Sequence, residues 1–255
     1  MPQLRKDPIL GRWVIISTER AKRPKDFPHI DTSPPEKECP FCRGKEALTP
    51  GELYSIKDDQ GNWRVRVVPS IKPFLESNKE LWKKGKGPYD LMEGVGSHEV
   101  VIDTPEHIAN MADLEIENIR DVFWAYCERI RVLQEDMRIK YVLVFKNYGW
   151  DAGGGRVRHS RSQIIATPVN LKRVKEELEG AKFYYDYHER CVFCDLIRQE
   201  LKEQERVVLE ENGFVALVPF APRFPFEVWI LPKEHSPDFY KTSWENLFSL
   251  ASLLK

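Results

Sequence analysis

The sequence has no long apolar run, no strong net charge and no cysteine-rich disulfide pattern. None of its segments approaches the roughly 20 apolar residues that cross a bilayer, and the opening MPQLRKDPIL lacks the apolar core of a signal peptide. With 39 basic and 40 acidic side chains, the formal net charge is −1, which gives no general attraction for a nucleic acid. We therefore expect a cytoplasmic globular protein that binds neither membrane nor nucleic acid, and any anion must be held by a local site.

Four of the five cysteines form two Cys-x-x-Cys pairs, Cys39 with Cys42 and Cys191 with Cys194. This spacing is typical of zinc knuckles, and without a secretory signal it favours zinc over a disulfide framework. A thioredoxin-type redox pair would begin a helix after a strand, whereas the first pair follows a proline-rich loop. Cys127 lies in a helical apolar pattern and is expected in the core.

The order of elements repeats around the two cysteine pairs. Each pair is followed by a strand that ends in Val-Pro, a turn with proline, a strand that closes near His107 or His235, and a helix. The repeat predicts two copies of one α+β unit, at residues 1–180 and 181–255. The second copy stops at Lys255, inside or just after its helix, and is expected to be incomplete.

The repeat also predicts metal ligands for the first unit. Cys39, Cys42, His107 and His159 make a Cys₂His₂ set, which is typical of a closed, structural tetrahedral zinc site. The alternative for His107 is a residue at a helix N-terminus with no metal.

The second unit offers a shorter ligand set, Cys191, Cys194 and His235. No clear fourth ligand follows these residues. The site could be empty, three-coordinate or completed by another group, for which His188 is a weak candidate.

The most unusual stretch spans residues 141–168, YVLVFKNYGWDAGGGRVRHSRSQIIATP. It predicts a buried strand, a glycine-rich turn and a second strand from Val157 onward. Consecutive glycines expose backbone N–H groups that can hold a phosphate. His159, Arg161 and Gln163 are two residues apart, so an extended strand points all three to one face. The alternative is a solvent-facing hairpin whose polar face has no function.

The remaining segments place further elements. Apolar spacing predicts a long amphipathic helix within residues 111–139, and a charged helix is expected within residues 169–190. His98 is expected to point outward from a strand. A basic cluster at residues 20–25 is either a solvated turn or a phosphate clamp.

Several segments together resemble the galactose-1-phosphate uridylyltransferase family of the histidine-triad superfamily. They are DPILGRWVIISTERAKRPKDF, CPFC, VRVVPS, GSHEVVIDTPEH, FKNYGWDAGGGRVRHSRSQIIATP, CVFC and PFAPRFPFEVWILPKEH. The resemblance implies an α+β fold of two histidine-triad-like units, each an antiparallel sheet with helices, the second truncated here. It further implies a homodimer, structural zinc, and ping-pong transfer of a nucleoside monophosphate from a nucleotide sugar to a hexose 1-phosphate in galactose metabolism. Related members act on ADP-glucose or diadenosine polyphosphates.

The resemblance also assigns roles to individual residues. The family signature His-Pro-His-x-Gln reads His-Ser-Arg-Ser-Gln here, so His159 matches the metal ligand and Gln163 the phosphate-binding glutamine. Arg161 occupies the position of the nucleophilic histidine. Ser70 stands where the family has an asparagine that faces the nucleoside. The other positions expected to bind substrate are Arg20, Arg23, Asn147, Gly154 and Arg156.

Arg161 changes the expected chemistry. A guanidinium is always protonated and has no lone pair, so it can bind a phosphate bidentately but cannot form a nucleotidyl intermediate. Three hypotheses follow. In the first, the protein is a UDP-glucose–hexose-1-phosphate uridylyltransferase with impaired activity, or an adenylyl-transferring or phosphorylase relative. In the second, it is an inactive nucleotide or nucleotide-sugar binding protein. In the third, it is an enzyme in which His159 leaves zinc and becomes the nucleophile, or in which direct displacement replaces the two-step route.

Overall fold

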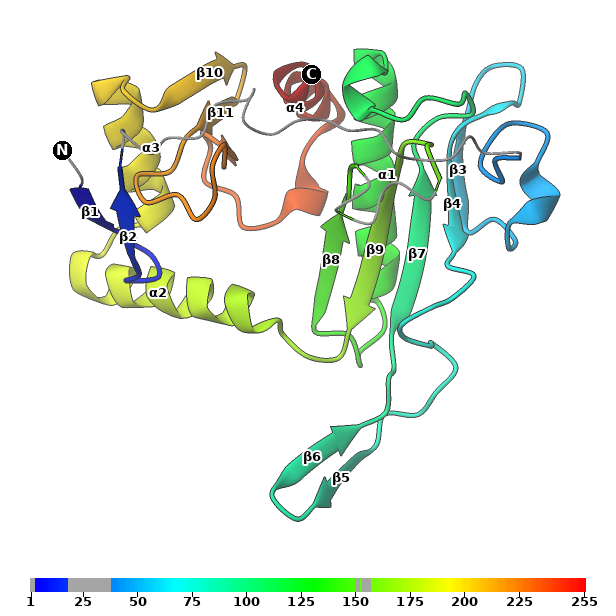
Figure 1. Ribbon diagram of the computed structural model, residues 1–255, viewed down its shortest axis with the longest axis horizontal. Coiled ribbons are helices and arrows are strands. Elements are labelled where there is room, and N and C mark those ends of the chain that lie inside the picture. Colours follow the sequence, from blue (N-terminus) through cyan, green and yellow to red (C-terminus); the bar gives the residue numbers. More distant parts are fainter. Residues whose placement is uncertain (1–2, 18–37, 150–151, 153–156) are drawn as a thin grey trace. The chain divides into compact units, whose positions relative to one another are not determined.

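The computed structural model describes residues 3–17, 38–149, 152 and 157–255, which form two compact units (Figure 1). The larger unit contains residues 31–170 and 238–255, and the smaller unit contains residues 1–30 and 171–237. The sequence-based ranges, 1–180 and 181–255, divide the chain once. In the structure, residues 1–30 group with residues 171–237, and residues 238–255 group with residues 31–170. Contacts between segments distant in sequence explain this difference, as described below.

The larger unit is built on a five-stranded antiparallel sheet with the strand order β3-β4-β7-β9-β8 (Figure 1). Its strands are β3 (Tyr54–Lys57), β4 (Trp63–Pro69), β7 (Ser97–Ile102), β8 (Tyr141–Phe145) and β9 (Arg161–Thr167). The fold is therefore α+β with antiparallel sheets, as predicted. The first strand of the glycine-rich hairpin is confirmed as β8, but β8 is a half-buried edge strand rather than a buried one. The second strand begins at Arg161, so the prediction of a start at Val157 was wrong.

One face of this sheet packs on the long helix α1 (Ile116–Gln134), which confirms the helix predicted within residues 111–139. β-Branched residues of β4, β7 and β9 alternate along the strands, and those that share this face are fully buried: Val65, Val67, Val101 and Ile164. The Tyr126 hydroxyl donates to Ser162 Oγ at 2.5 Å, which links the helix to β9. The opposite face of β7 and β9 is left for His98, Arg161 and Gln163.

A buried ion pair joins α1 to β7. The Arg129 guanidinium donates to both carboxylate oxygens of Glu99 at 2.8 Å, and Glu99 is 1% exposed. Each charge is tolerated in the core because the other one neutralises it.

Breaking this pair should destabilise the larger unit strongly. Arg129→Met leaves a buried carboxylate without its cation, and we expect the free energy of unfolding to fall by about 3–5 kcal/mol. Urea unfolding at 25 °C measures the change. The matched control is Lys79→Met, because Lys79 pairs with Glu76 at 3.7 Å on the surface of the same unit; it should cost less than about 1 kcal/mol. Equal losses in the two variants would contradict the prediction.

The C-terminal helix α4 (Trp244–Leu254) completes the larger unit by packing on α1. The Trp244 ring meets Trp124 edge to face with a centroid separation of 5.1 Å, and the Arg120 guanidinium lies 4.1 Å from the Trp244 ring centre. Ser243 caps the helix by accepting from the amide of Asn246. The helix that the sequence predicts here is confirmed, and these contacts group it with the first half of the chain.

A separate two-stranded hairpin, β5 (Lys83–Lys86) with β6 (Tyr89–Met92), extends away from the five-stranded sheet (Figure 1). Arg138 holds the segment before β5 by donating to the carbonyls of Ser77 and Lys79 at 2.9 and 2.6 Å.

The smaller unit combines helices with two antiparallel sheets. Its elements are β1 (Gln3–Lys6), β2 (Trp13–Ile16), α2 (Lys172–His188), α3 (Val192–Glu203), β10 (Val207–Glu211), β11 (Phe214–Leu217) and β12 (Trp229–Pro232). The helix predicted within residues 169–190 is confirmed as α2; the sequence did not predict α3.

The N-terminal hairpin is anchored within the smaller unit. Arg5 and Arg12 donate to the carbonyls of Phe220 and Ala221 at 3.3 and 3.4 Å. Gly180 of α2 faces Ile9, where an added Cβ would lie only 2.0 Å from the Ile9 carbonyl oxygen. A side chain at residue 180 would force α2 and this hairpin apart.

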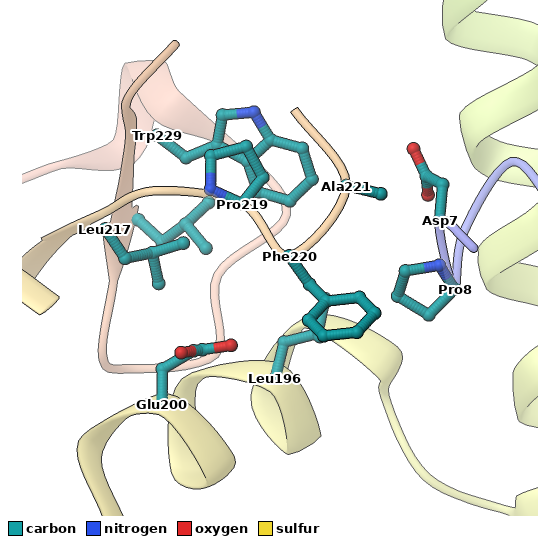
Figure 2. A pocket seen from close by; sticks show the side chains of 10 residues that line it. Asp7, Pro8, Leu196, Glu200, Leu217, Pro219, Phe220, Ala221 and Trp229 are labelled. Carbon is teal, nitrogen blue, oxygen red and sulfur yellow. The ribbon is translucent and has the colours of Figure 1, made fainter. Parts of the chain in front are cut away.

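The interior of the smaller unit contains a cavity of about 10 Å³ lined by Leu217, Trp229 and the side chains of Asp7 and Glu200 (Figure 2). A space of this size holds at most one water molecule. A nucleotide cannot bind there. None of the helices in the described part of the chain is long and apolar enough to span a membrane.

Candidate active site and metal centre

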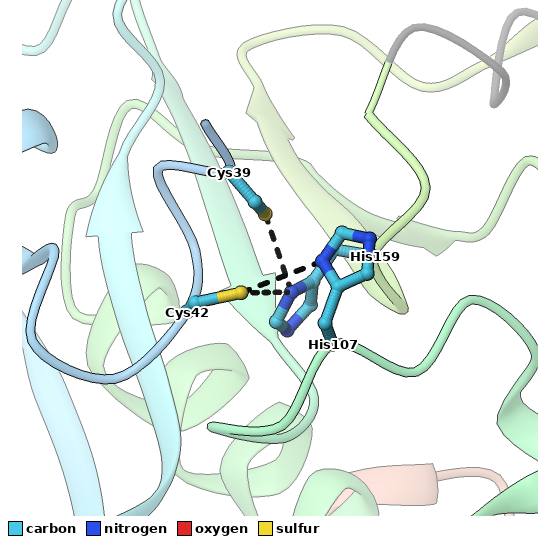
Figure 3. Close-up of side chains that lie close together, drawn as sticks. All are labelled: Cys39, Cys42, His107 and His159. Atoms are coloured by element: carbon cyan, nitrogen blue, oxygen red, sulfur yellow. Dashed lines mark hydrogen bonds between the residues drawn. The ribbon is translucent and has the colours of Figure 1, made fainter. Parts of the chain in front are cut away.

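Four metal-ligating side chains of the larger unit converge: Cys39, Cys42, His107 and His159 (Figure 3). His159 Nδ1 lies 3.4 Å from the Cys39 sulfur and 3.7 Å from the Cys42 sulfur. His107 Nδ1 lies 3.4 Å from the Cys42 sulfur. The structure thus brings together all four residues that the sequence nominated.

The spacing of these atoms suits zinc. Zinc bonds of about 2.3 Å to sulfur and 2.0–2.1 Å to nitrogen place the two ligand atoms about 3.5 Å apart at a tetrahedral angle. The three separations, 3.4, 3.4 and 3.7 Å, lie close to this value. Two thiolates and two imidazoles are also the donor set that structural zinc prefers.

His159 is oriented for this role by its second ring nitrogen. Nε2 donates to the carbonyl oxygen of Thr104 at 2.8 Å, which leaves the Nδ1 lone pair facing the cysteines. His159 is 2% exposed, and this burial lowers its pKa, although the bond to Thr104 opposes the shift. The neutral imidazole that can ligate a metal is therefore favoured.

Backbone contacts hold the cysteine loop against the sheet. The Arg43 amide donates to the carbonyl of Pro105 at 3.0 Å, beside His107. Phe41, between the two cysteines, packs on a buried cluster that includes Val68 and Ile102. The Cys-Pro-Phe-Cys sequence thus supplies two ligands and an apolar anchor in four residues.

The start of β9 is fixed by a buried polar network. The ammonium group of Lys146 lies 2.5 Å from an Asp103 oxygen, 2.9 Å from Ser160 Oγ and 3.0 Å from the carbonyl of Arg161. The Ser160 hydroxyl also donates to Asp103 at 2.8 Å. Asp103 is fully buried, and Lys146 balances its charge. The hydrogen bonds of Lys146 and Asp103 to Ser160 and to the carbonyl of Arg161 hold residues 160 and 161 in place.

Arg161 is half-buried at the first position of β9. Its Nη1 donates to the carbonyl of Val157 at 2.6 Å and lies 3.3 Å from the carbonyl of His159. Its guanidinium lies 5.8 Å from the centre of the Phe41 ring. The cation therefore lies beside the metal-ligand group.

Gln163 lies two residues further along the same face of β9, and His98 on the neighbouring strand contacts it. His98 Nε2 lies 2.8 Å from Gln163 Oε1. The prediction that His98 points outward was wrong, since the residue is 5% exposed. The segment at Phe74 covers this part of β7, and the alternation of β7 alone gives no sign of that cover.

Family models described as galactose-1-phosphate uridyl transferase match the chain twice, the N-terminal domain at residues 1–170 and the C-terminal domain at residues 177–255. The chain belongs to this uridyl transferase family. The resemblance seen in the sequence is confirmed.

Individual relatives of the family are similar over the whole chain. An ADP-glucose phosphorylase from Arabidopsis thaliana is 38% identical over 259 residues, which covers 100% of this chain and 72% of the relative. A galactose-1-phosphate uridylyltransferase from Thermotoga maritima is 31% identical over 255 residues, covering 100% and 74%. A crystal structure of an ADP-glucose phosphorylase from Arabidopsis thaliana with bound ADP-glucose has a TM-score of 0.81 at 36% identity, and the similarity covers 100% of this chain and 75% of that one.

The second candidate metal group of this chain lies in the smaller unit. Cys191, Cys194 and His235 have ligand atoms within 4.8 Å of one another, and Cys194 Sγ lies 3.3 Å from His235 Nδ1. His188 is not part of this group, and its ring contacts Tyr184 and Tyr187 instead. Among the described residues, this group offers three ligands where the first offers four.

The remaining residues that the family pattern assigns to substrate binding lie partly inside and partly outside the described part of the chain. Asn147 is exposed just after the end of β8. Arg20, Arg23, Gly154 and Arg156 lie outside the described residues.

Cys127 is fully buried on α1, which confirms its place in the core, and burial raises the pKa of its thiol to about 12.

Proposed function

We propose that the protein is a nucleotidyltransferase-family member that binds a nucleoside diphosphate sugar at the half-buried Arg161 and Gln163, on the face of β7 and β9 opposite α1, and that position 161 does not take part in covalent transfer. The observation that carries the proposal is the placement of Arg161 and Gln163 side by side on this face, next to the metal-ligand group. Both side chains can donate hydrogen bonds to phosphate oxygens.

The same residues support binding more than turnover. Arg161 stands where the family pattern has a nucleophilic histidine, and a guanidinium has no lone pair to attack phosphorus. A fixed positive charge stabilises the bound diphosphate as well as the transition state, so by itself it strengthens binding without accelerating the reaction. We therefore propose that two-step transfer by this chain is impaired.

Zinc in this proposal is structural. The four-residue group of Cys39, Cys42, His107 and His159 has no position left for substrate when all four ligands are bound. Zinc there would connect the cysteine loop to β9 and so hold Arg161 in place. At the three-residue group of Cys191, Cys194 and His235, we propose a second site completed by a further group.

Two nucleotide sugars have specific support as the ligand. UDP-glucose, with a hexose 1-phosphate as the second substrate, follows from the family and from the Thermotoga maritima relative. ADP-glucose follows from the 38% identical phosphorylase and from the similar structure that contains this ligand. We favour ADP-glucose, because Ser70 departs from the asparagine of the uridylyltransferase pattern.

Calorimetry tests the binding site directly. The full chain should bind ADP-glucose, and Gln163→Ala should weaken binding by about tenfold or more, because a hydrogen bond to a charged group contributes about 1.5–3 kcal/mol. Gln199→Ala is the matched control, since Gln199 is an exposed residue of α3 that bonds to Glu203; it should change the affinity less than twofold. If neither ADP-glucose nor UDP-glucose binds, the proposal is wrong.

A further inference from the structure

Both ring nitrogens of the buried His98 have partners. The backbone amide of Phe74 donates to Nδ1 at 3.3 Å, and Nε2 lies 2.8 Å from the side-chain oxygen of Gln163. The Phe74 ring stacks on the imidazole with a centroid separation of 4.6 Å and an interplanar angle of 12°. His98 is therefore held on three sides.

These partners determine where the imidazole hydrogen lies. A backbone amide can only donate, so Nδ1 must accept and cannot carry a hydrogen. The neutral ring then carries its hydrogen on Nε2, which donates to Gln163. Since only the oxygen of a glutamine amide accepts, the oxygen must face His98 and the NH₂ group must point elsewhere.

The strand register shows which side chains share a face with Gln163. Gln163 pairs with Val100, and Arg161 with Ile102, so His98, Gln163 and Arg161 share one face of the β7–β9 ladder. Gln163 is half-buried and its neighbour on the strand face is a cation. With its oxygen bound to His98, Gln163 turns its two N–H donors away from His98.

We propose that His98 is a positioning residue that holds Gln163 with its amide donors, rather than its oxygen, toward the phosphate of a nucleotide sugar. This inference rests on the proposed function. Without His98, the amide can rotate, and in half of its orientations an oxygen would face the anionic phosphate. A ligand would then have to select the productive orientation and would lose the support of the Phe74–His98–Gln163 chain of hydrogen bonds.

The tautomer of His98 can be measured without a ligand. Long-range ¹⁵N–¹H correlation spectra of the histidine-labelled full chain, assigned with a His98→Phe spectrum, should show His98 as a neutral ring with its hydrogen on Nε2. A ring with its hydrogen on Nδ1 would overturn the inference, because Gln163 would then have to turn its NH₂ group toward His98.

A double-mutant cycle tests the coupling to the ligand. His98→Phe keeps an aromatic ring against Phe74 but removes the donor, and we expect it to weaken ADP-glucose binding about tenfold. In the Gln163→Ala background, the same change should cost less than twofold, because its effect passes through Gln163. Equal losses in both backgrounds would overturn the proposal, since a general structural effect of residue 98 does not need Gln163.

Two further measurements keep the outcome decisive. His98→Gln can place an amide donor near the position of Nε2, so it should recover affinity to within about threefold of the unsubstituted protein; no recovery would count against the donor role. Thermal unfolding and zinc content identify a variant that has lost its fold, and the tautomer measurement then decides. Failure of the proposed function looks different, because the unsubstituted protein itself would bind neither ADP-glucose nor UDP-glucose.

Discussion

Arg161→His should acquire a covalently bound nucleoside monophosphate when it is incubated with ADP-glucose or UDP-glucose, whereas the unsubstituted protein should acquire none. A neutral imidazole has the lone pair that guanidinium lacks, and at pH 8 an imidazole with an ordinary pKa of about 6.5 is unprotonated. The new side chain would stand on the strand face next to Gln163, where we expect the phosphates to bind. Attack on the α-phosphorus would release the hexose 1-phosphate.

The expected gain is large, because a nucleophile acts in every turnover of a two-step route. Loss of a catalytic nucleophile or its base costs a protease about 10⁶ in turnover, and restoring one in a site built around other residues should recover part of such a factor. We expect adduct to form on Arg161→His at least about 10²-fold faster than the detection limit set by the unsubstituted protein. Intact-mass measurement of quenched samples detects the adduct and gives its rate.

The controls separate the lone pair from the loss of arginine. Arg161→Ala also removes the hydrogen bonds to the carbonyls of Val157 and His159 but supplies no nucleophile, so it should form no adduct. An adduct on the unsubstituted protein would contradict the argument about Arg161 and would favour attack by His159. If Arg161→His forms no adduct although ADP-glucose still binds, the other phosphate-facing residues do not support transfer.

Local sequence patterns predicted the metal-ligand group of the larger unit well. The spacing of Cys39 and Cys42 and the repeated position of His107 are local properties, and a closed tetrahedral set needs only one more ligand on a neighbouring strand. His159 is that residue, and its orientation comes from the Thr104 carbonyl, which no local pattern indicates. The sequence therefore indicated which four side chains converge but not the hydrogen bond that orients one of them.

His98 shows why part of the site could not be predicted. In the sequence, His98 stands between the polar residues Ser97 and Glu99, so no local pattern marks its side chain as buried. Its burial comes from Phe74, 24 residues earlier, whose segment crosses that face. The edge position of β8 was missed for a similar reason, because an apolar run of five residues does not show how many neighbours a strand has.

The grouping of the chain ends also depends on contacts between distant segments. A helix at residues 244–254 is evident from its apolar spacing, but its partner is α1, more than 100 residues earlier. The pairing uses Trp124, Trp244 and the guanidinium of Arg120, which are individually unremarkable in the sequence. A repeat in the order of elements thus predicted the types of elements and not which of them pack together.

Cys39→Ser should remove zinc from the larger unit and lower its stability by more than any surface substitution. Changing a group that merely orients a ligand costs about 10–100-fold in metal affinity, or about 1.4–2.7 kcal/mol, so loss of a ligand should cost more. Structural zinc contributes on the order of 10 kcal/mol in small zinc domains, which is comparable with the whole stability of a typical domain, about 5–15 kcal/mol. A loss of about 3 kcal/mol lowers Tm by roughly 6–12 °C in a unit of this size.

The design compares three cysteines under one substitution. Cys39→Ser should lower the zinc content by one ion per chain, together with Tm. Cys127→Ser changes a buried cysteine outside both metal groups, so its zinc content should equal that of the unsubstituted protein. Cys194→Ser tests the three-residue group, and its effect on Tm should be smaller, because the described part of that site has one ligand fewer. Metal analysis by mass spectrometry and thermal unfolding supply both readings. Unchanged zinc in Cys39→Ser would mean that the four convergent side chains do not hold the ion, and the packing of Phe41 and the hydrogen bond from Arg43 to Pro105 would then hold the cysteine loop without it.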